Sequence, residues 1–285
     1  MGTLLIFGLG YSGRAIARLA ANAGWRVVGT SRTPGLVAAI PGVEIVPFAE
    51  AHLAGITHLL ATAAPDAAGD PVLAAHHSQI AAATDLRWAG YLSTTGVYGD
   101  RAGGWVDEAT PVAPSGPRGQ RRVAAEQQWA TLGRRIAVDL FRLAGIYGPG
   151  RSPFDDLRAG TARRIAKPGH AFGRIHRDDI AGAVLAALHQ TLPPAVRVLN
   201  LNDDLPAEPA AVVAEAARLL GLPAPPLIPY AEAAFSPMAQ SFWAENRKVA
   251  SAQTQAHLRR QWRWPTYREG LAAILAEERA NGLGQ

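Results

Sequence analysis

The sequence predicts an α/β protein: a doubly wound parallel sheet with a smaller C-terminal lobe. Three observations support this fold class. Short apolar runs alternate with segments of helical periodicity along the first half of the chain, as stacked βαβ units require. The first apolar run passes directly into a glycine-rich turn and then a helix. After residue 150 the alternation loosens, which indicates a separate, less regular lobe.

The first half contains continuous apolar runs bounded by turn residues, which are typical of strands buried on both faces. The helix expected over 12–24 has apolar residues at helical spacing and ends on Gly24, a favoured C-cap residue. The expected strands cover 3–8, 25–32, 43–48, 57–65, 88–100 (running into a loop) and 135–150, and the expected helices cover 12–24, 70–84 and 121–132.

The second half combines helical patterns with proline-rich segments. Prolines favour an extended conformation over 223–230. A helix followed by an irregular segment is expected over 152–169. Further helices are expected over 175–190, 209–222 and 266–280, with one more strand over 197–203.

Composition bounds the class of protein. The chain has 285 residues, of which 48% are hydrophobic and 18% charged, so it can bury a sizeable core. It contains no cysteine, which excludes disulfides, thiol nucleophiles and thiolate zinc sites. No apolar run approaches the ~20 residues of a membrane helix, and the N-terminus lacks the positive region of a signal peptide. We therefore expect a cytoplasmic protein that does not enter membranes.

The net charge of +5 raises the question of nucleic-acid binding. The arginines are scattered along the chain, and no basic run is interleaved with aromatic residues, so we expect no nucleic-acid partner. A local arginine cluster could instead serve a phosphorylated small molecule. His76 and His77 have no spaced partner residues, so no metal site is expected.

The stretch "LLIFGLGYSGRAIA" places Gly8, Gly10 and Gly13 in a G-x-G-x-x-G pattern after a strand and before a helix. In that context Gly8 permits a tight turn, Gly10 admits a diphosphate and Gly13 allows close packing of helix on sheet. The helix N-terminus, with Tyr11 and Ser12, adds a partial positive charge. This pattern predicts a Rossmann-type dinucleotide site.

The end of the second strand indicates which dinucleotide is bound. An NAD site usually has a carboxylate there, whereas this strand ends in Thr30-Ser31-Arg32. A hydroxyl and a guanidinium bind a 2′-phosphate that a carboxylate would repel, so we expect NADP(H), with NAD as a possibility. Thr62 and Ala63, in the 57–65 strand, complete the expected cofactor site.

The ordered motifs resemble those of the extended short-chain dehydrogenase/reductases, in the NAD(P)-dependent epimerase/dehydratase branch. The matching segments are "YLSTTGVYGD" (91–100), "FRLAGIYGPGR" (141–151) and "RIHRDDIAGAV" (174–184). The resemblance implies a dinucleotide-binding domain over 1–150, to which 175–203 returns. It also implies a smaller substrate lobe from 151–174 and 204–265, and a C-terminal helix within 266–285.

Family chemistry uses a Ser or Thr, a Tyr and a Lys four residues after the Tyr. The resemblance places Thr94 at the Ser/Thr position, Arg118 at the Tyr position and Arg122 at the Lys position. No tyrosine lies between Tyr98 and Tyr147, and no lysine precedes Lys167. Arginine cannot usefully release a proton, so the usual acid–base pair is absent. Arg122 could still hold a ribose hydroxyl.

Other residues remain candidates for the site. Tyr98 is close in sequence to Thr94 and is a candidate proton donor, but a packed tyrosine beneath the loop is the interpretation that we favour. The resemblance places Thr95, Arg118, Tyr147 and His176 near the substrate. His176 titrates in a useful range, but it could instead orient its loop.

Two function classes follow. The chain is either an NADP(H)-dependent oxidoreductase with a non-standard active site or a binding protein that senses the dinucleotide. The missing phenol counts against a third option, a sugar-nucleotide epimerase. A substrate that arrives protonated, such as an iminium, could accept hydride without a tyrosine. By resemblance, a small-molecule substrate is expected, and a homodimer is possible through helices 70–84 and 121–132.

Overall fold

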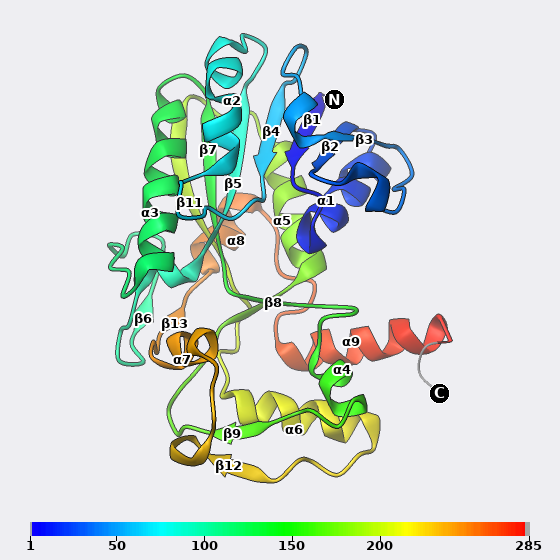
Figure 1. Ribbon diagram of the computed structural model, residues 1–285, viewed down its shortest axis with the longest axis vertical. Helices are drawn as coiled ribbons and strands as arrows, with labels where there is room; N and C mark the ends of the chain where they lie inside the picture. The colour runs from blue at the N-terminus through cyan, green and yellow to red at the C-terminus, as the bar shows by residue number, and fades with distance from the viewer. Residues whose placement is uncertain (1, 283–285) are drawn as a thin grey trace.

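Seven parallel strands form the central sheet of the computed structural model, which describes residues 2–282 without the side chains of residues 237, 238 and 241 (Figure 1). Every pairing in this sheet is parallel. The strands are β1 (Thr3–Phe7), β2 (Arg26–Ser31), β3 (Val43–Pro47), β4 (His58–Ala61), β5 (Trp88–Thr94), β7 (Ala137–Leu143) and β11 (Ala195–Leu201).

The strand order is β11-β7-β5-β4-β1-β2-β3, so the direction of winding reverses between β1 and β4. Leu5 of β1 is level with Val28 of β2 on one side and with Leu59 of β4 on the other. In open parallel sheets, ligands bind beyond the carboxyl ends of the strands at such a reversal. The predicted doubly wound fold class is confirmed.

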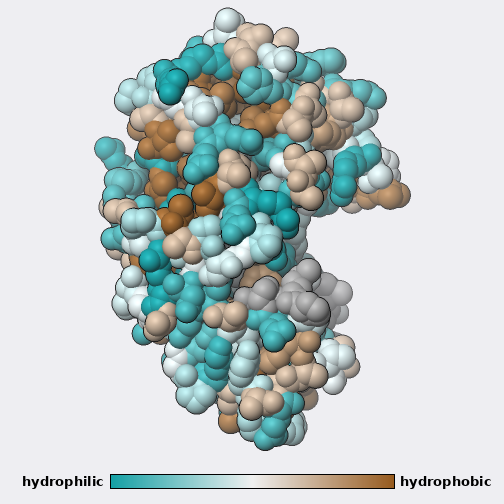
Figure 2. Space-filling view, turned by 60° about the vertical axis from the view of Figure 1, so that its left-hand side comes forward, coloured by the Kyte–Doolittle hydropathy of each residue, from teal (hydrophilic) through white to brown (hydrophobic). Residues whose placement is uncertain are grey.

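Helices cover both faces of the sheet, and each face has its own hydrophobic core. One core joins α1 and α5 to the sheet and includes Ile16 and Val184, while the opposite core includes Val72 and Trp129 from α2 and α3. Figure 2 shows a face with apolar residues gathered in its upper part. The helices are α1 (Tyr11–Asn22), α2 (Pro71–Ala82), α3 (Pro117–Ala130), α5 (Arg177–Leu188) and α8 (Ala252–Leu258).

A smaller lobe lies below the sheet in Figure 1 and has a third core. That core packs Phe154 and Leu157 against Ala216 and against Leu271 and Ile274. We call these elements the lower lobe: α4 (Pro153–Arg158), β9 (Arg164–Ala166), α6 (Pro209–Leu220), β12 (Leu227–Pro229), α7 (Pro237–Trp243) and α9 (Tyr267–Ala280).

Two short parallel pairs link distant parts of the chain. Strand β8 (Gly145–Tyr147) pairs with β10 (Arg174–His176), and β6 (Trp105–Val106) pairs with β13 (Lys248–Val249). Single 3-10 turns complete the elements: η1 (Pro34–Leu36), η2 (Phe48–Glu50), η3 (Thr95–Tyr98), η4 (Thr131–Arg134) and η5 (Tyr230–Glu232).

Most expected elements are present, with shifted ends. The helix expected from 121 begins at Pro117, because proline is well suited to the first position of a helix. The strand expected over 135–150 is divided at Ala144 into β7 and β8. Helices α7 and α8 were not expected. None of the helices in the described part of the chain is long and apolar enough to cross a membrane.

Candidate functional site

The glycine loop after β1 has the geometry that its sequence predicts. Gly8 has a φ of +106°, a conformation that side chains disfavour. A Cβ on Gly13 would lie 2.1 Å from the Gly8 carbonyl oxygen, so glycine is required where α1 meets the loop. A Cβ on Gly10 would meet nothing within 4 Å, which leaves open space at the N-terminus of α1.

Two threonines hold this loop from below. The Gly8 amide donates to Thr30 Oγ1 at 3.2 Å, and Thr62 Oγ1 donates to the Gly8 carbonyl oxygen at 2.7 Å. Thr30 is fully buried, so it supports the loop from within the sheet. Sequence reasoning identified Thr62 as part of the site but missed this role of Thr30.

A cavity of about 200 Å³ lies over the carboxyl ends of the strands and contacts the loop. Six predicted cofactor residues line it: Gly10, Tyr11, Ser12, Gly13, Thr62 and Arg122. Five residues that were not predicted complete the wall: Leu92, Ser93, Leu143, Ile146 and Arg151. The cavity therefore unites segments from six separate parts of the chain.

Arg122 reaches the cavity from α3. Its Nη1 donates to the Leu92 carbonyl oxygen at 2.7 Å and to the Tyr91 hydroxyl at 3.1 Å. Burial raises the pKa of Tyr91 to about 12, so this phenol stays neutral and acts as an acceptor for the guanidinium. Arg122 thus presents a fixed positive charge beside the ends of β5 and β7.

A buried ion pair holds α3 against the sheet. Arg142 donates to both carboxylate oxygens of Glu126, at 3.1 and 2.7 Å, and Ser93 Oγ donates to the same carboxylate at 2.5 Å. Both charged side chains are almost completely buried, at 7% and 5% exposure. This network was not predicted, and it fixes the helix that carries Arg122.

Thr94 is half-buried at the end of β5, and its hydroxyl has a defined partner. Thr94 Oγ1 accepts a hydrogen bond from the Gly96 amide at 3.1 Å. A hydroxyl that accepts from the backbone keeps its own proton for a different acceptor. Thr94 is therefore oriented to donate, whereas its neighbour Thr95 is buried at the start of η3.

Tyr98 lies beneath the loop, away from the cavity. It is fully buried, and its hydroxyl donates to Asn200 Oδ1 at 2.8 Å. The Arg142 guanidinium lies over its ring at 4.8 Å, and burial raises the pKa of the phenol. A buried, hydrogen-bonded phenol with a raised pKa is a poor proton donor to a ligand, so we assign Tyr98 no ligand contact.

Tyr147 and His176 are also buried outside the cavity. A Cβ on Gly270 of α9 would lie 2.0 Å from the Tyr147 hydroxyl, so that hydroxyl points toward the lower lobe. His176 Nδ1 accepts from the Asp178 amide at 3.2 Å and caps α5, and burial lowers the pKa of His176 to about 4. These positions suit structural roles, and we assign neither residue a ligand contact.

The remaining predicted residues lie at the margins of the site. Ser31 Oγ accepts from the Thr33 amide at 3.1 Å at the end of β2, and Arg32 beside it is exposed. Ala63 follows Thr62 and packs against the core on the α2 side. Arg118 is exposed, with its guanidinium 5.2 Å from the centre of the Phe242 ring. None of these four residues lines the cavity over the glycine loop in the described structure.

Tyr11 joins the glycine loop to the turn after β8. Its hydroxyl donates to the Pro149 carbonyl oxygen at 3.0 Å. The guanidinium groups of Arg151 and Arg177 lie 5.7 and 5.3 Å from the centre of its ring. Arg151 also lines the cavity, so it adds positive charge close to the N-terminus of α1. No group of His, Cys, Asp and Glu residues within the described residues could hold a metal ion.

A glycine turn between the first strand and helix of this parallel sheet defines the class of Rossmann-type proteins. A solved structure from Silicibacter pomeroyi DSS, described as a functionally unknown conserved protein, is 48% identical to the chain with a TM-score of 0.90. The likeness covers 97% of this chain and 99% of that one. The chain therefore belongs to the same family as that protein.

More distant proteins share part of the sequence or the fold. Protein YeeZ of Escherichia coli K12 is 37% identical over 138 residues, a match that spans 47% of each chain and so about half the length of YeeZ. Human epimerase family protein SDR39U1, solved with NADPH, is 20% identical with a TM-score of 0.74, covering 95% of this chain and 98% of that one. Other structural neighbours are NAD-dependent epimerase/dehydratase-like proteins. No family model matches the chain.

Proposed function

We propose that this protein is an NADP(H)-dependent oxidoreductase of the short-chain dehydrogenase/reductase type that works without the usual Tyr/Lys pair. The observation that carries the proposal is the cavity in which Gly10, Gly13, Thr62 and Arg122 meet at the carboxyl ends of the strands. The structural neighbours solved with NAD or NADPH support a nicotinamide dinucleotide as the cofactor.

The residues of the cavity fit a dinucleotide. The open space at Gly10 and the free amides at the start of α1 suit a diphosphate, with Arg151 as a further positive charge. Arg122 would hold the nicotinamide ribose. Ser31 and Arg32 would bind a 2′-phosphate, which is why we propose NADP(H) ahead of NAD(H). When bound, the reduced nicotinamide supplies a hydride.

The chain offers little for proton transfer at this place. No Asp, Glu, His or Lys is found among the described residues that line the cavity. The Tyr11 hydroxyl is engaged with Pro149, and burial raises its pKa. Thr94 can donate a hydrogen bond to a substrate oxygen, but a threonine hydroxyl is not an acid. The proton therefore comes from solvent or arrives with the substrate.

The second candidate is a dinucleotide-sensing protein. Arg118 and Arg122, at the positions where the family has its Tyr and Lys, favour the sensor, because a sensor needs no proton donor. Thr94 favours the enzyme, because a pure sensor has no use for an oriented hydroxyl beside the nicotinamide position. A homodimer through α2 and α3 stays a prediction.

Turnover separates the two candidates. The wild-type protein with NADPH would be screened against imines, aldehydes, ketones and sugar nucleotides by the loss of NADPH absorbance. Steady oxidation with at least one class supports the enzyme, and the loss of that rate in Thr94→Val, with NADPH affinity unchanged, assigns it to this site. NADPH binding without turnover in every class would favour the sensor.

A further inference from the structure

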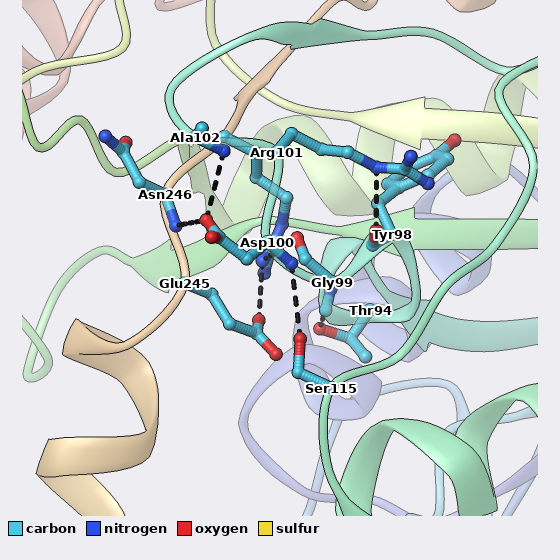
Figure 3. A network of polar contacts seen from close by, with 11 residues as sticks. Thr94, Tyr98, Gly99, Asp100, Arg101, Ala102, Ser115, Glu245 and Asn246 are labelled. Atoms are coloured by element: carbon cyan, nitrogen blue, oxygen red, sulfur yellow. Dashed lines mark hydrogen bonds and ion pairs between the residues drawn. The ribbon is translucent and has the colours of Figure 1, made fainter.

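A segment from the lower lobe returns to the loop that follows Thr94. Figure 3 shows Glu245 and Asn246 beside the loop that carries Gly99 and Asp100. The backbone amide of Asn246 donates to Asp100 Oδ1 at 2.8 Å. The backbone carbonyl oxygen of Asn246 accepts from the backbone amides of Arg101 and Gly103 at 3.0 and 2.9 Å. Strand β13 then pairs with β6, so this segment is held on both sides.

Arg247, the next residue, is held in one position by two acceptors. Its Nη1 donates to the Gly99 carbonyl oxygen at 2.8 Å and to Glu245 Oε2 at 2.5 Å. Only 16% of its side chain is exposed. Its Nη2 makes no hydrogen bond to another of the described residues. That nitrogen can therefore donate to a ligand.

Arg247 Nη2 and the Thr94 hydroxyl converge over Gly96. A Cβ placed on Gly96 would lie 3.4 Å from Thr94 Oγ1 and 3.8 Å from Arg247 Nη2. Gly96 is half-buried and does not have a positive φ. Its backbone therefore does not require glycine, and the missing side chain leaves a small space between two hydrogen-bond donors.

We propose that Thr94 and Arg247 bind a carboxylate group of the substrate in the space over Gly96. This inference rests on the proposed function only in taking Thr94 to face the substrate. The two donors, on two residues, match the two oxygens of a carboxylate. A substrate with such a carboxylate can have either a carbonyl or an imine as its reacting group. A cationic iminium that lacks an acidic group would be repelled by Arg247.

Charge decides between a carboxylate and a phosphate. The Glu245 carboxylate lies against Arg247. The pKa of Asp100 is lowered mainly by the hydrogen bond from the Asn246 backbone amide, and the positive charge of Arg247 adds to this effect. Because these two carboxylates offset the guanidinium, the site suits a monoanion better than a phosphate dianion. Glu245 therefore acts as a selectivity residue as well as a support for Arg247.

Calorimetric titration tests the proposal with acetate, 2-oxobutanoate and inorganic phosphate as probes, both with and without NADPH. The wild-type protein is expected to bind the carboxylates in preference to phosphate. Arg247→Gln is expected to weaken carboxylate binding at least tenfold, because it removes the charged donor. Arg134→Gln, a change at an exposed arginine, is the matched control and should leave every affinity unchanged.

Two further variants separate binding from folding. In Gly96→Ala the added methyl group makes only ordinary contacts of 3.4 Å or more, so the protein should fold normally while the carboxylate is displaced. Glu245→Gln keeps an acceptor for Arg247 but removes a negative charge, so phosphate binding should rise. A merely structural role for Arg247 would not produce that gain.

The proposal is overturned if the wild type binds no carboxylate, or if carboxylate affinity is the same in wild type, Arg247→Gln and Gly96→Ala. The titration without NADPH measures carboxylate binding alone, so its result does not depend on the proposed function. Carboxylate binding that persists while NADPH fails to bind would contradict the cofactor assignment and leave the carboxylate site standing.

Discussion

Arg122 Nη1 donates to the carbonyl oxygen of Leu92 at 2.7 Å and so connects helix α3 to the carboxyl end of strand β5. The contact explains how an arginine can occupy the position at which the resembling family has a lysine. One nitrogen of the guanidinium anchors the side chain to the sheet, and Arg122 is also among the residues that line the cavity. A lysine ammonium is a point charge on a flexible stem and lacks this rigid fork.

The two glycines of the loop predict opposite outcomes when each is changed to alanine. Gly13→Ala should destabilise the protein by about 1–3 kcal/mol, because its Cβ would lie 2.1 Å from a carbonyl oxygen. Gly10→Ala should fold normally yet lose roughly tenfold or more in NADPH affinity, because its methyl group enters the diphosphate space. Denaturant unfolding and calorimetry measure the two effects. Equal effects of both changes on stability would contradict this assignment.

Arg32 sets the preference for the phosphorylated cofactor in our account. Arg32→Asp should lower NADPH affinity by about tenfold to a hundredfold, since a charged hydrogen bond contributes about 1.5–3 kcal/mol. NADH affinity should fall little or rise, because a carboxylate can accept from the ribose hydroxyls. Arg26→Asp, at an exposed position at the other end of the same strand, is the control. Unchanged NADPH affinity in Arg32→Asp would remove the basis for NADP(H).

How much of the site could be predicted depended on distance along the chain. The glycine loop was predictable because its requirements lie within a few residues of one another. Arg122 was found through the spacing of a family motif. Tyr98, Tyr147 and His176 have the same local signals as site residues, but their burial depends on Asn200, Gly270 and Trp264, which lie far along the sequence.

The same reason explains what was missed. Arg151 ends the segment 141–151 but has no local signal of a site residue, and Arg247 lies in no segment that was singled out. Each reaches its place only because a turn or the lower lobe folds back on the sheet. The short helices α7 and α8, of seven residues each, were missed because seven residues carry too little periodicity to be distinguished from a loop.

The buried pair of Glu126 and Arg142 should be costly to break. Glu126→Gln leaves a buried guanidinium without its counter-charge and should destabilise the fold by about 3 kcal/mol. Glu215→Gln, which breaks the more exposed pair with Arg218 on α6, is the matched control and should have little measurable effect. Denaturant midpoints of the two variants give the comparison, and equal midpoints would count against the role of the buried pair.

His170 should make the protein less stable in acid. The pKa of His170 is lowered to about 4, against 6.5 in the unfolded chain. The main cause is burial, and the positive charges of Lys167 and Arg247 add to it. Between pH 6.5 and 4 the unfolded chain binds the extra proton, so this contribution to stability is present above pH 6.5 and is lost as the pH falls toward 4.

The size of that loss is about 3 kcal/mol at most. Asp203, with a pKa raised by burial to about 8, acts in the opposite direction, so wild-type protein alone does not isolate the effect. His170→Phe keeps an aromatic ring against Trp243 and should flatten the stability curve between pH 6.5 and 4 relative to wild type. Parallel curves for the two proteins would show that His170 does not titrate in this way.

We propose that the cavity beside Gly10 and Arg122 holds a dinucleotide, and the decisive experiment is a calorimetric titration of the wild-type protein with NADPH and NADH. We expect saturable binding of one NADPH per chain, with a higher affinity than that for NADH. The absence of binding heat with either nucleotide, at protein concentrations that would detect micromolar affinity, would contradict it.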